Sequence, residues 1–332
     1  MTAPRLQVVR DELPDSETLA IGQSQGATDI LHEDKSRYPR FTRLRGLHGL
    51  AGSMAPGEVW MAGARVGNGK SLFAQNVMDD FIGQQLPTLY VGTEQDPEVL
   101  RIKHACIRAG VSARLMLKPD EHEIHSTAYE GARDAVQREL QWLRQEAHHL
   151  ALFANCEYVN QTELRRWIVG GVEKYDIRCV IVDHIDQVAH GSGQNSVHEL
   201  TATLQMIHGL MREHEMAALI LSQLKRTIDP IRRYTPPEEQ DFAGASGKER
   251  IASVMFGLWR PLRTDLGIKE LRALLADVKH GFKAEDRVYQ PNTMGVRLLK
   301  DRLGDVPGKQ IMLYVGKGGR LDDDDAATHG IR

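Results

Sequence analysis

Residues 64–71 read ARVGNGKS, a run whose residue types suit the binding of nucleotide phosphates. It follows an apolar stretch typical of a strand and precedes a helix start. Gly67 and Gly69 let the backbone curl so that its N–H groups point at a phosphate, and the helix N-terminus adds a partial positive charge. Lys70 is expected to reach the β- and γ-phosphates, and the Ser71 hydroxyl to bind Mg²⁺. The predicted nucleotide-binding residues are Ala64, Arg65, Val66, Gly67, Asn68, Gly69, Lys70, Ser71 and Leu72.

The start of this run departs from the strict phosphate-loop pattern. Ala64 stands where that pattern has a glycine, and Gly63 comes one residue early. The alternative interpretation is an ordinary strand-to-helix turn, which the surrounding strand and helix signals disfavour. These residues alone do not distinguish a kinase, a GTPase, a transporter motor and a DNA motor.

Polar residues that end three other apolar runs are expected at the same edge of a sheet, because the carboxyl ends of parallel strands meet there. Asp183 follows CVIV and is predicted to hold the water shell of Mg²⁺. Glu94 ends TLYVGTE and is a candidate to orient or deprotonate an attacking water, although an exposed loop glutamate fits the spacing equally. Gln223 is a weaker candidate for sensing the γ-phosphate. Asp186 is interpreted as a surface acid.

The elements that must position these residues alternate along the chain. Short apolar runs bounded by turn residues predict strands, and longer stretches at helical spacing predict crossover helices, the pattern of an α/β fold with a mostly parallel sheet and helices on both faces. Asp96 and Pro97 indicate a helix start. Pro307 and Gly308 predict the turn of a C-terminal β-hairpin. The predicted strands are 59–64, 88–94, 150–154, 179–183, 217–222 and 254–259.

Composition limits the classes of partner. The 42 Lys and Arg residues face 45 Asp and Glu residues, and the net charge of -3 excludes a global basic field. Any nucleic-acid site must therefore be local. The 3 cysteines fit no metal-ligand spacing and suit a reducing compartment. No signal peptide or membrane span is recognisable, so we expect a cytoplasmic protein without a membrane partner.

The two ends of the chain differ from its body. Residues 1–40 are polar and are predicted to be an arm or linker with one short helix. Residues 41–320 are the predicted ordered domain. Residues 321–332 are acidic and poor in apolar residues, which predicts a disordered tail.

Five segments together resemble the C-terminal ATPase domain of DnaB-type replicative helicases, which has a RecA-like fold. In chain order they are PGEVWMAGARVGNGKS, LYVGTEQDPEVL, IVDHIDQV, ILSQLKR and LLKDRLGDVPG. The resemblance runs from about Phe41 to Leu321 and includes the alanine-arginine start of the phosphate loop. It implies ATP and Mg²⁺ as cofactors, with Lys70, Ser71 and Asp183 in the roles given above.

The resemblance also implies roles in hydrolysis. Glu94 becomes the expected catalytic base and Gln223 the glutamine that couples nucleotide state to DNA. Lys300 and Arg302 match a basic pair that reaches the γ-phosphate of the neighbouring subunit, which implies a ring, expected to be a hexamer. Without the resemblance, these two residues are ordinary surface charges of a hairpin.

The family carries its DNA-contacting loops between Gln223 and the strand at 254. The first third of this segment is basic here, and a glycine-containing turn, GASG, follows at 244–247. Where the family has an arginine and a glutamate before that turn, this chain has Ala243 and Gly244. The predicted residues that bind single-stranded DNA are Arg226, Arg232, Arg233, Gly244, Ser246, Gly247 and Lys248.

Two further departures concern whole segments. About 40 residues of arm stand where such helicases have a helical domain that contacts primase. Residues 260–292 form an extra stretch predicted to be mostly helical, with a partner or ring-interface surface as the only role we assign to it.

The sequence predicts a Mg²⁺-ATP-dependent ring motor on single-stranded DNA that acts as a replicative helicase, with a loader or primase as a further partner. The alternative is a RecA- or KaiC-like ATPase in recombination, repair or regulation that does not unwind DNA processively. A P-loop kinase ranks last, because SQLKR and KDR have no role there.

Overall fold

The computed structural model describes residues 38–154, 159–188, 196–225, 236–242, 245–260, 292–303 and 307–323. The compact body begins at Tyr38. Among these residues, no helix is long and apolar enough to cross a membrane.

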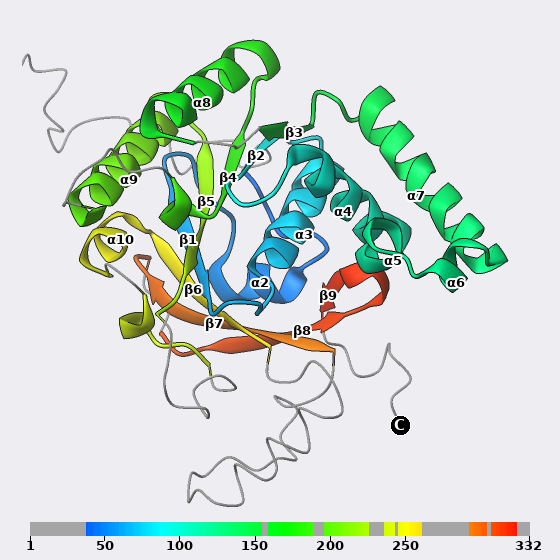
Figure 1. Cartoon of the computed structure of the whole chain (residues 1–332). Helices are drawn as coiled ribbons and strands as arrows, with labels where there is room; N and C mark the ends of the chain where they lie inside the picture. The colour runs from blue at the N-terminus through cyan, green and yellow to red at the C-terminus, as the bar shows by residue number, and fades with distance from the viewer. Residues whose placement is uncertain are drawn as a thin grey trace, which may run out of the picture. The chain divides into compact units, whose positions relative to one another are not determined.

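A nine-stranded sheet with the order β3-β2-β4-β5-β1-β6-β7-β8-β9 forms the centre of this body (Figure 1). Strands β1 to β6 pair in parallel, and β7 to β9 continue the sheet in antiparallel fashion. The predicted α/β class with a mostly parallel sheet is therefore confirmed. The strands are β1 Val59–Ala64, β2 Thr88–Gly92, β3 Ala151–Ala154, β4 Cys179–Asp183, β5 Ala217–Gln223, β6 Val254–Trp259, β7 Thr293–Asp301, β8 Gln310–Val315 and β9 Leu321–Asp323.

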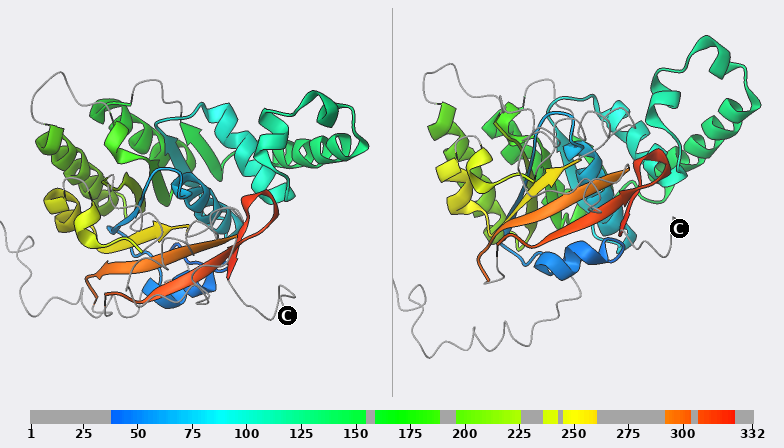
Figure 2. Two further views of the ribbon diagram at one scale, coloured as in Figure 1. Left: turned by 60° about the horizontal axis from the view of Figure 1, so that its bottom comes forward. Right: turned by 90° about the horizontal axis from the view of Figure 1, so that it is seen from below.

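Helices cover both faces of the sheet. The first face carries α3, α4 and α2, and the second carries α8, α9 and α10 (Figure 1). Helix α7 packs on α4 and extends away from the body (Figure 2). The helices are α2 Arg45–Ala51, α3 Lys70–Gly83, α4 Pro97–Ala109, α5 Ala113–Leu117, α6 Glu121–Ile124, α7 Thr127–Gln145, α8 Gln161–Tyr175, α9 Ser196–Glu213 and α10 Ala245–Ile251, with short 3₁₀ turns η2 Ile185–Gln187, η4 Glu239–Asp241 and η6 Lys317–Gly319.

The parallel strands are apolar throughout because both of their faces are covered. Along β1, Trp60 and Ala62 belong to the core under α3, whereas Val59 and Met61 belong to the core under α8 and α9. Strands β1, β4 and β6 match their predicted ranges residue for residue.

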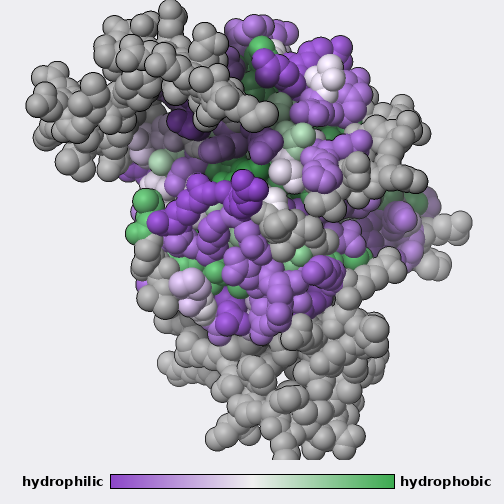
Figure 3. All heavy atoms as spheres, turned by 90° about the vertical axis from the view of Figure 1, so that its left-hand side faces the viewer, coloured by the Kyte–Doolittle hydropathy of each residue, from purple (hydrophilic) through white to green (hydrophobic). Residues whose placement is uncertain are grey.

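Local helix signals were equally informative. The Asp96 carboxylate accepts a hydrogen bond from the Glu98 N–H at 2.8 Å and caps α4, with Pro97 as its first residue. The apolar stripe of α9 faces the sheet, and the surface on this side of the body is mainly hydrophilic (Figure 3). The residues of that stripe are Leu200, Leu204, Ile207 and Met211.

The antiparallel end of the sheet contains the predicted hairpin and one difference from expectation. Strands β7 and β8 pair around Pro307 and Gly308, and Gly308 has a φ of 101°. The prediction of a tail from residue 321 was wrong for its first residues, which form β9. Leu321 is fully buried, and its N–H donates to the Asn76 side chain at 2.8 Å. One buried leucine and the pairing with β8 thus outweigh the acidic composition.

Candidate nucleotide site

The phosphate loop leaves the end of β1 and enters α3. Gly67 and Gly69 have φ values of 73° and 88°, a backbone region that favours glycine. Gly69 is the N-cap of α3, so Lys70 and Ser71 begin the helix and its first N–H groups have no partner within the helix. This geometry suits a phosphate at the helix N-terminus. The predicted residues therefore fit a nucleotide, with Lys70 and Ser71 placed to approach its phosphates and a Mg²⁺ ion.

Arg65 differs from the rest of the loop. Its side chain is buried, and its guanidinium donates to Asp241 Oδ2 at 2.9 Å. The Asp241 carboxylate also accepts the Glu238 N–H at 2.9 Å, and its carbonyl accepts the Lys225 N–H at 2.8 Å. The Arg65 side chain thus ties the phosphate loop to the chain on either side of residues 226–235.

Asp183 ends β4, and Glu94 follows the adjacent strand β2 by two residues at the same edge. Gly92 of β2 lies opposite Asp183 of β4, and Thr93 N–H donates to the Asp183 carbonyl at 2.7 Å. The buried Asp183 carboxylate accepts the Tyr90 hydroxyl at Oδ2, 2.6 Å away, and its Oδ1 accepts no hydrogen bond from the residues that the structure describes. This second oxygen fits the expected role of holding a water of Mg²⁺.

A cluster missed by the sequence interpretation surrounds Glu94. His184 is buried, with Nε2 at 3.0 Å from Glu94 Oε1 and Nδ1 at 3.2 Å from Asp186 Oδ2. The interpretation of Asp186 as a surface acid was wrong, because its carboxylate also accepts the Gln223 N–H at 2.7 Å and the Lys248 ammonium at 2.6 Å. The DHID spacing offered no signal for this, since Lys248 comes 62 residues later.

The electrostatics of this cluster follow from its pairing. Burial raises the pKa of Asp186, but hydrogen bonds from His184 and Lys248 and the Lys248 charge outweigh it and hold that pKa well below its usual range. Burial lowers the pKa of His184, but the hydrogen bonds of Asp186 and Glu94 and the Asp186 charge outweigh it and raise that pKa. The charge of Lys70 opposes this rise.

Gln223 completes this edge. It is the last residue of β5 and lies opposite Ala64, the last residue of β1. The fold thus brings Lys70, Ser71, Glu94, Asp183 and Gln223 to the carboxyl ends of the parallel strands.

Lys300 and Arg302 lie at the opposite edge of the sheet, where the parallel strands begin. Strand β7 is antiparallel to β6, and its residue Lys300 lies opposite Met255 near the start of β6. The start of β6 adjoins Trp60 near the start of β1. The Lys300 ammonium donates to the Glu249 carbonyl and the Arg302 guanidinium to the Arg250 carbonyl. This pair is therefore separated from the phosphate loop of its own chain by the length of β1.

The predicted DNA-binding residues divide into those within and those outside the described part of the chain. Gly247 and Lys248 belong to α10, and the expectation for the Lys248 side chain needs correction: it is completely buried and pairs with Asp186 and Ser222, 2.6 and 2.8 Å away. A completely buried ammonium group is not accessible to DNA. Ser246 belongs to α10 by its backbone. Arg226, Arg232, Arg233 and Gly244 lie outside the described residues, as does most of the 260–292 stretch.

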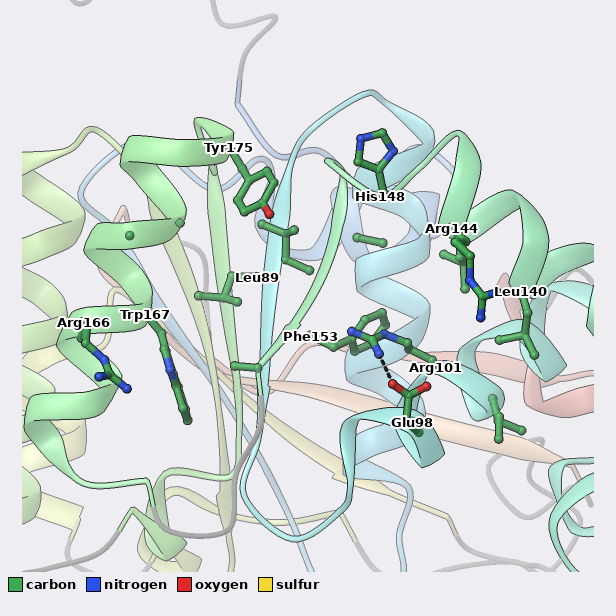
Figure 4. Close-up of a pocket in the computed structure, with 17 residues that line it drawn as sticks. Leu89, Glu98, Arg101, Leu140, Arg144, His148, Phe153, Arg166, Trp167 and Tyr175 are labelled. Atoms are coloured by element: carbon green, nitrogen blue, oxygen red, sulfur yellow. Dashed lines mark hydrogen bonds and ion pairs between the residues drawn. The ribbon is translucent and has the colours of Figure 1, made fainter.

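A cavity of 810 Å³ lies elsewhere, over the β3 edge of the sheet (Figure 4). Arg101, Arg144 and Arg166 line it together with Trp167, and none of the predicted site residues does. The nucleotide site is thus built from strand ends and not from this cavity. His148 and His149 are exposed, and the described residues contain no group of three or more potential ligands arranged to hold a metal.

Comparison with known proteins identifies a family that this chain matches. The family described as DnaB-like helicase C terminal domain matches residues 41–307. The fold is similar to a structure titled as a DnaB-like replicative helicase and its interactions with primase, with a TM-score of 0.65 at 14% identity over 91% of this chain and 67% of that chain. It is also similar to a second solved structure, titled as an ATPase domain, with a TM-score of 0.67 at 13% identity over 90% of this chain and 97% of that chain. No curated protein matches.

Proposed function

The chain belongs to the family of DnaB-like helicase C-terminal domains, and we propose that it is a ring-shaped motor that hydrolyses ATP with Mg²⁺ and unwinds DNA in replication. The ring, expected to be a hexamer, encircles single-stranded DNA, and a loader or primase is its expected partner. The family is one of ATP-hydrolysing helicase domains, which supports the nucleotide-binding and hydrolytic parts of this proposal.

The observation that carries the proposal is the separation of two half-sites. Lys70, Glu94, Asp183 and Gln223 lie at one edge of the sheet, and the pair that would contact the γ-phosphate lies at the other. A single subunit therefore cannot complete its own site without unfolding β7. A head-to-tail arrangement of copies places the Lys300 and Arg302 edge of one copy against the phosphate loop of the next, and such interfaces form rings where the rotation between copies closes.

Directed motion requires this coupling of subunits. Each base-pair step of DNA costs about 1.4 kcal/mol in stacking alone, so strand separation needs hydrolysis linked to movement. In the proposed site, Glu94 activates water while Lys300 and Arg302 stabilise the charge that develops on the γ-phosphate.

Subunit mixing tests the shared site directly. Lys70→Ala and Arg302→Ala rings are each expected to be inactive. In equimolar mixtures assembled together, about a quarter of the interfaces combine an intact phosphate loop with an intact Arg302, so ATP turnover returns. Mixtures that stay inactive although mass measurement shows mixed rings would contradict the shared site.

A strand-displacement assay on a forked duplex tests the helicase proposal. Unwinding that depends on ATP and on Arg302 supports it. Turnover stimulated by single-stranded DNA without unwinding favours the second candidate, a RecA- or KaiC-like DNA-binding or regulatory ATPase. The burial of Lys248, which removes one predicted DNA contact, is the observation that keeps this candidate in view.

A further inference from the structure

Lys248 is a buried charge that the proposed mechanism does not use. Lys248 belongs to α10, and its side chain is completely buried. Its ammonium donates to Asp186 Oδ1 at 2.6 Å and to Ser222 Oγ at 2.8 Å. Burying a lysine is unfavourable unless its charge is paired and its N–H groups are satisfied. The ion pair with Asp186 and the hydrogen bond to Ser222 meet this requirement for Lys248.

The ion pair leads to two residues with predicted roles at the phosphates. While Oδ1 of Asp186 accepts from Lys248, its Oδ2 accepts the Gln223 N–H at 2.7 Å and lies 3.2 Å from His184 Nδ1. His184 Nε2 in turn contacts Glu94 Oε1 at 3.0 Å. The Asp186 carboxylate thus fixes both the end of β5 and the His184 imidazole, which contacts Glu94.

Helix α10 also contacts the other half-site. The carbonyl groups of Glu249 and Arg250, the two residues after Lys248, accept hydrogen bonds from the side chains of Lys300 and Arg302. The helix is seated closely on α9, since a Cβ added at Gly247 would lie 2.5 Å from Thr201 Oγ1. A shift of α10 would therefore displace Asp186 at one edge of the sheet and Lys300 and Arg302 at the other.

We propose that Lys248 is a positioning residue: through Asp186 it holds Gln223 and the His184 ring beside Glu94, and through its own helix it ties this cluster to Lys300 and Arg302. This inference rests on the proposed function, because it concerns the geometry of ATP hydrolysis. Displacing a catalytic group by about 1 Å can cost roughly 100-fold in rate. Loss of the ammonium is thus expected to reduce kcat without weakening ATP binding at the phosphate loop.

The test compares Lys248→Met, Asp186→Asn and the double variant with the wild-type ring. We expect Lys248→Met to lower kcat by about 10- to 100-fold, with the Kd for a fluorescent ATP analogue changed less than about twofold. The melting temperature also falls, because Asp186 is left without its partner. Lys174→Met, at an exposed lysine of α8, is the matched control and keeps wild-type values.

The double variant separates positioning from stability. Removing both charges is expected to recover the melting temperature, whereas kcat stays low because no carboxylate orients His184 and Gln223. A double variant with recovered melting temperature and wild-type kcat overturns the inference, as does a Lys248→Met ring with wild-type kcat. If Lys248→Met alone does not fold, the kcat of the double variant decides.

The outcomes distinguish this inference from the proposed function. A correctly assembled wild-type ring without ATP turnover refutes the proposed function. A wild-type ring that hydrolyses ATP, together with a Lys248→Met ring that hydrolyses it equally fast, refutes the positioning role alone.

Discussion

The two edges of the central sheet hold their polar side chains in different ways. At the edge where the parallel strands end, Asp183 is buried and Asp186 is half-buried, and each has hydrogen-bonded protein partners at its carboxylate. At the opposite edge, Arg302 is exposed, and among the described residues its guanidinium donates a hydrogen bond to a main-chain carbonyl. The first edge is preorganised within one subunit, and the second presents charges outward.

This difference is the basis of the proposal that the two edges act together. Preorganised donors and acceptors stabilise developing charge only when they surround it. In the proposed mechanism, the edge where the parallel strands end supplies the phosphate loop and Glu94, and Lys300 and Arg302 of a neighbouring copy complete it. Changes at the two edges should therefore affect different steps.

The largest effect is expected at the outward edge. Arg302→Ala should lower the ATP turnover of the assembled ring by about 10³-fold or more, the scale of an arginine finger in GTPases. ATP binding should persist, because Arg302 lies far from the phosphate loop of its own chain. Turnover and binding of a fluorescent ATP analogue measure the two effects. Arg133→Ala, at an exposed arginine of α7, is the control. Full turnover by Arg302→Ala would show that the finger assignment is wrong.

Glu94→Gln tests the proposed base at the edge where the parallel strands end. Turnover should fall about 10²- to 10³-fold, because the amide cannot accept a proton from water. Mixing with Lys70→Ala should restore turnover to the Arg302 variant but not to Glu94→Gln. In the Glu94 mixture, every intact phosphate loop belongs to a subunit that lacks the proposed base. Glu98→Gln, nearby on α4 and exposed, should retain the wild-type rate. Restored activity in the Glu94 mixture would exclude Glu94 as the base.

Tyr90→Phe tests the support of the proposed metal ligand. It removes the 2.6 Å hydrogen bond to Asp183 Oδ2, and the loss of such a partner typically costs about 10- to 100-fold in metal affinity. We expect the Mg²⁺ concentration for half-maximal turnover to rise about tenfold, with kcat at saturating Mg²⁺ nearly unchanged. A Mg²⁺ titration of turnover measures this. Tyr129→Phe on α7 should leave the titration unchanged, and an unshifted curve for Tyr90→Phe would argue against Asp183 as the ligand.

The smallest effect on turnover is expected away from both edges, at His104 in α4. Burial outweighs the opposing Asp79 charge and lowers the pKa of His104 to about 4 from 6.5. Between about pH 6.5 and 4, His104 binds a proton in the unfolded chain but stays neutral in the folded chain. The free energy of unfolding therefore falls as the pH is lowered through this range. This contribution is at most roughly 3 kcal/mol.

His104→Phe should remove that part of the acid sensitivity while turnover at neutral pH stays the same. Urea unfolding between about pH 4.5 and 7.5 measures the change, and His148→Phe at an exposed histidine should retain the wild-type pH dependence. An unchanged pH dependence for His104→Phe would mean that another group causes the acid sensitivity.

Local sequence patterns predicted most of the fold. The ranges of β1, β4 and β6 followed from apolar runs, because strands buried on both faces read as continuous apolar segments. The start of α4 followed from Asp96 and Pro97. The β9 strand was missed, since a three-residue element with two aspartates has no periodicity to detect.

The candidate site divides in the same way. Asp183, Glu94 and Gln223 were identifiable because each ends a parallel strand, and parallel strands end at one edge. The ion pair between Arg65 and Asp241 was not predicted, because the two residues are 176 positions apart in the chain. Lys248 was assigned to DNA, although its ion pair with Asp186 hides it in the protein.

By itself, the sequence determined the α/β class, the phosphate loop and the strand ends that carry polar residues, because these depend on short-range periodicity and on backbone freedom at single glycines. Only the tertiary structure decided which charges are enclosed and which face outward. That choice depends on pairing between residues far apart in the chain, since a buried charge is tolerated only where a distant element brings its partner.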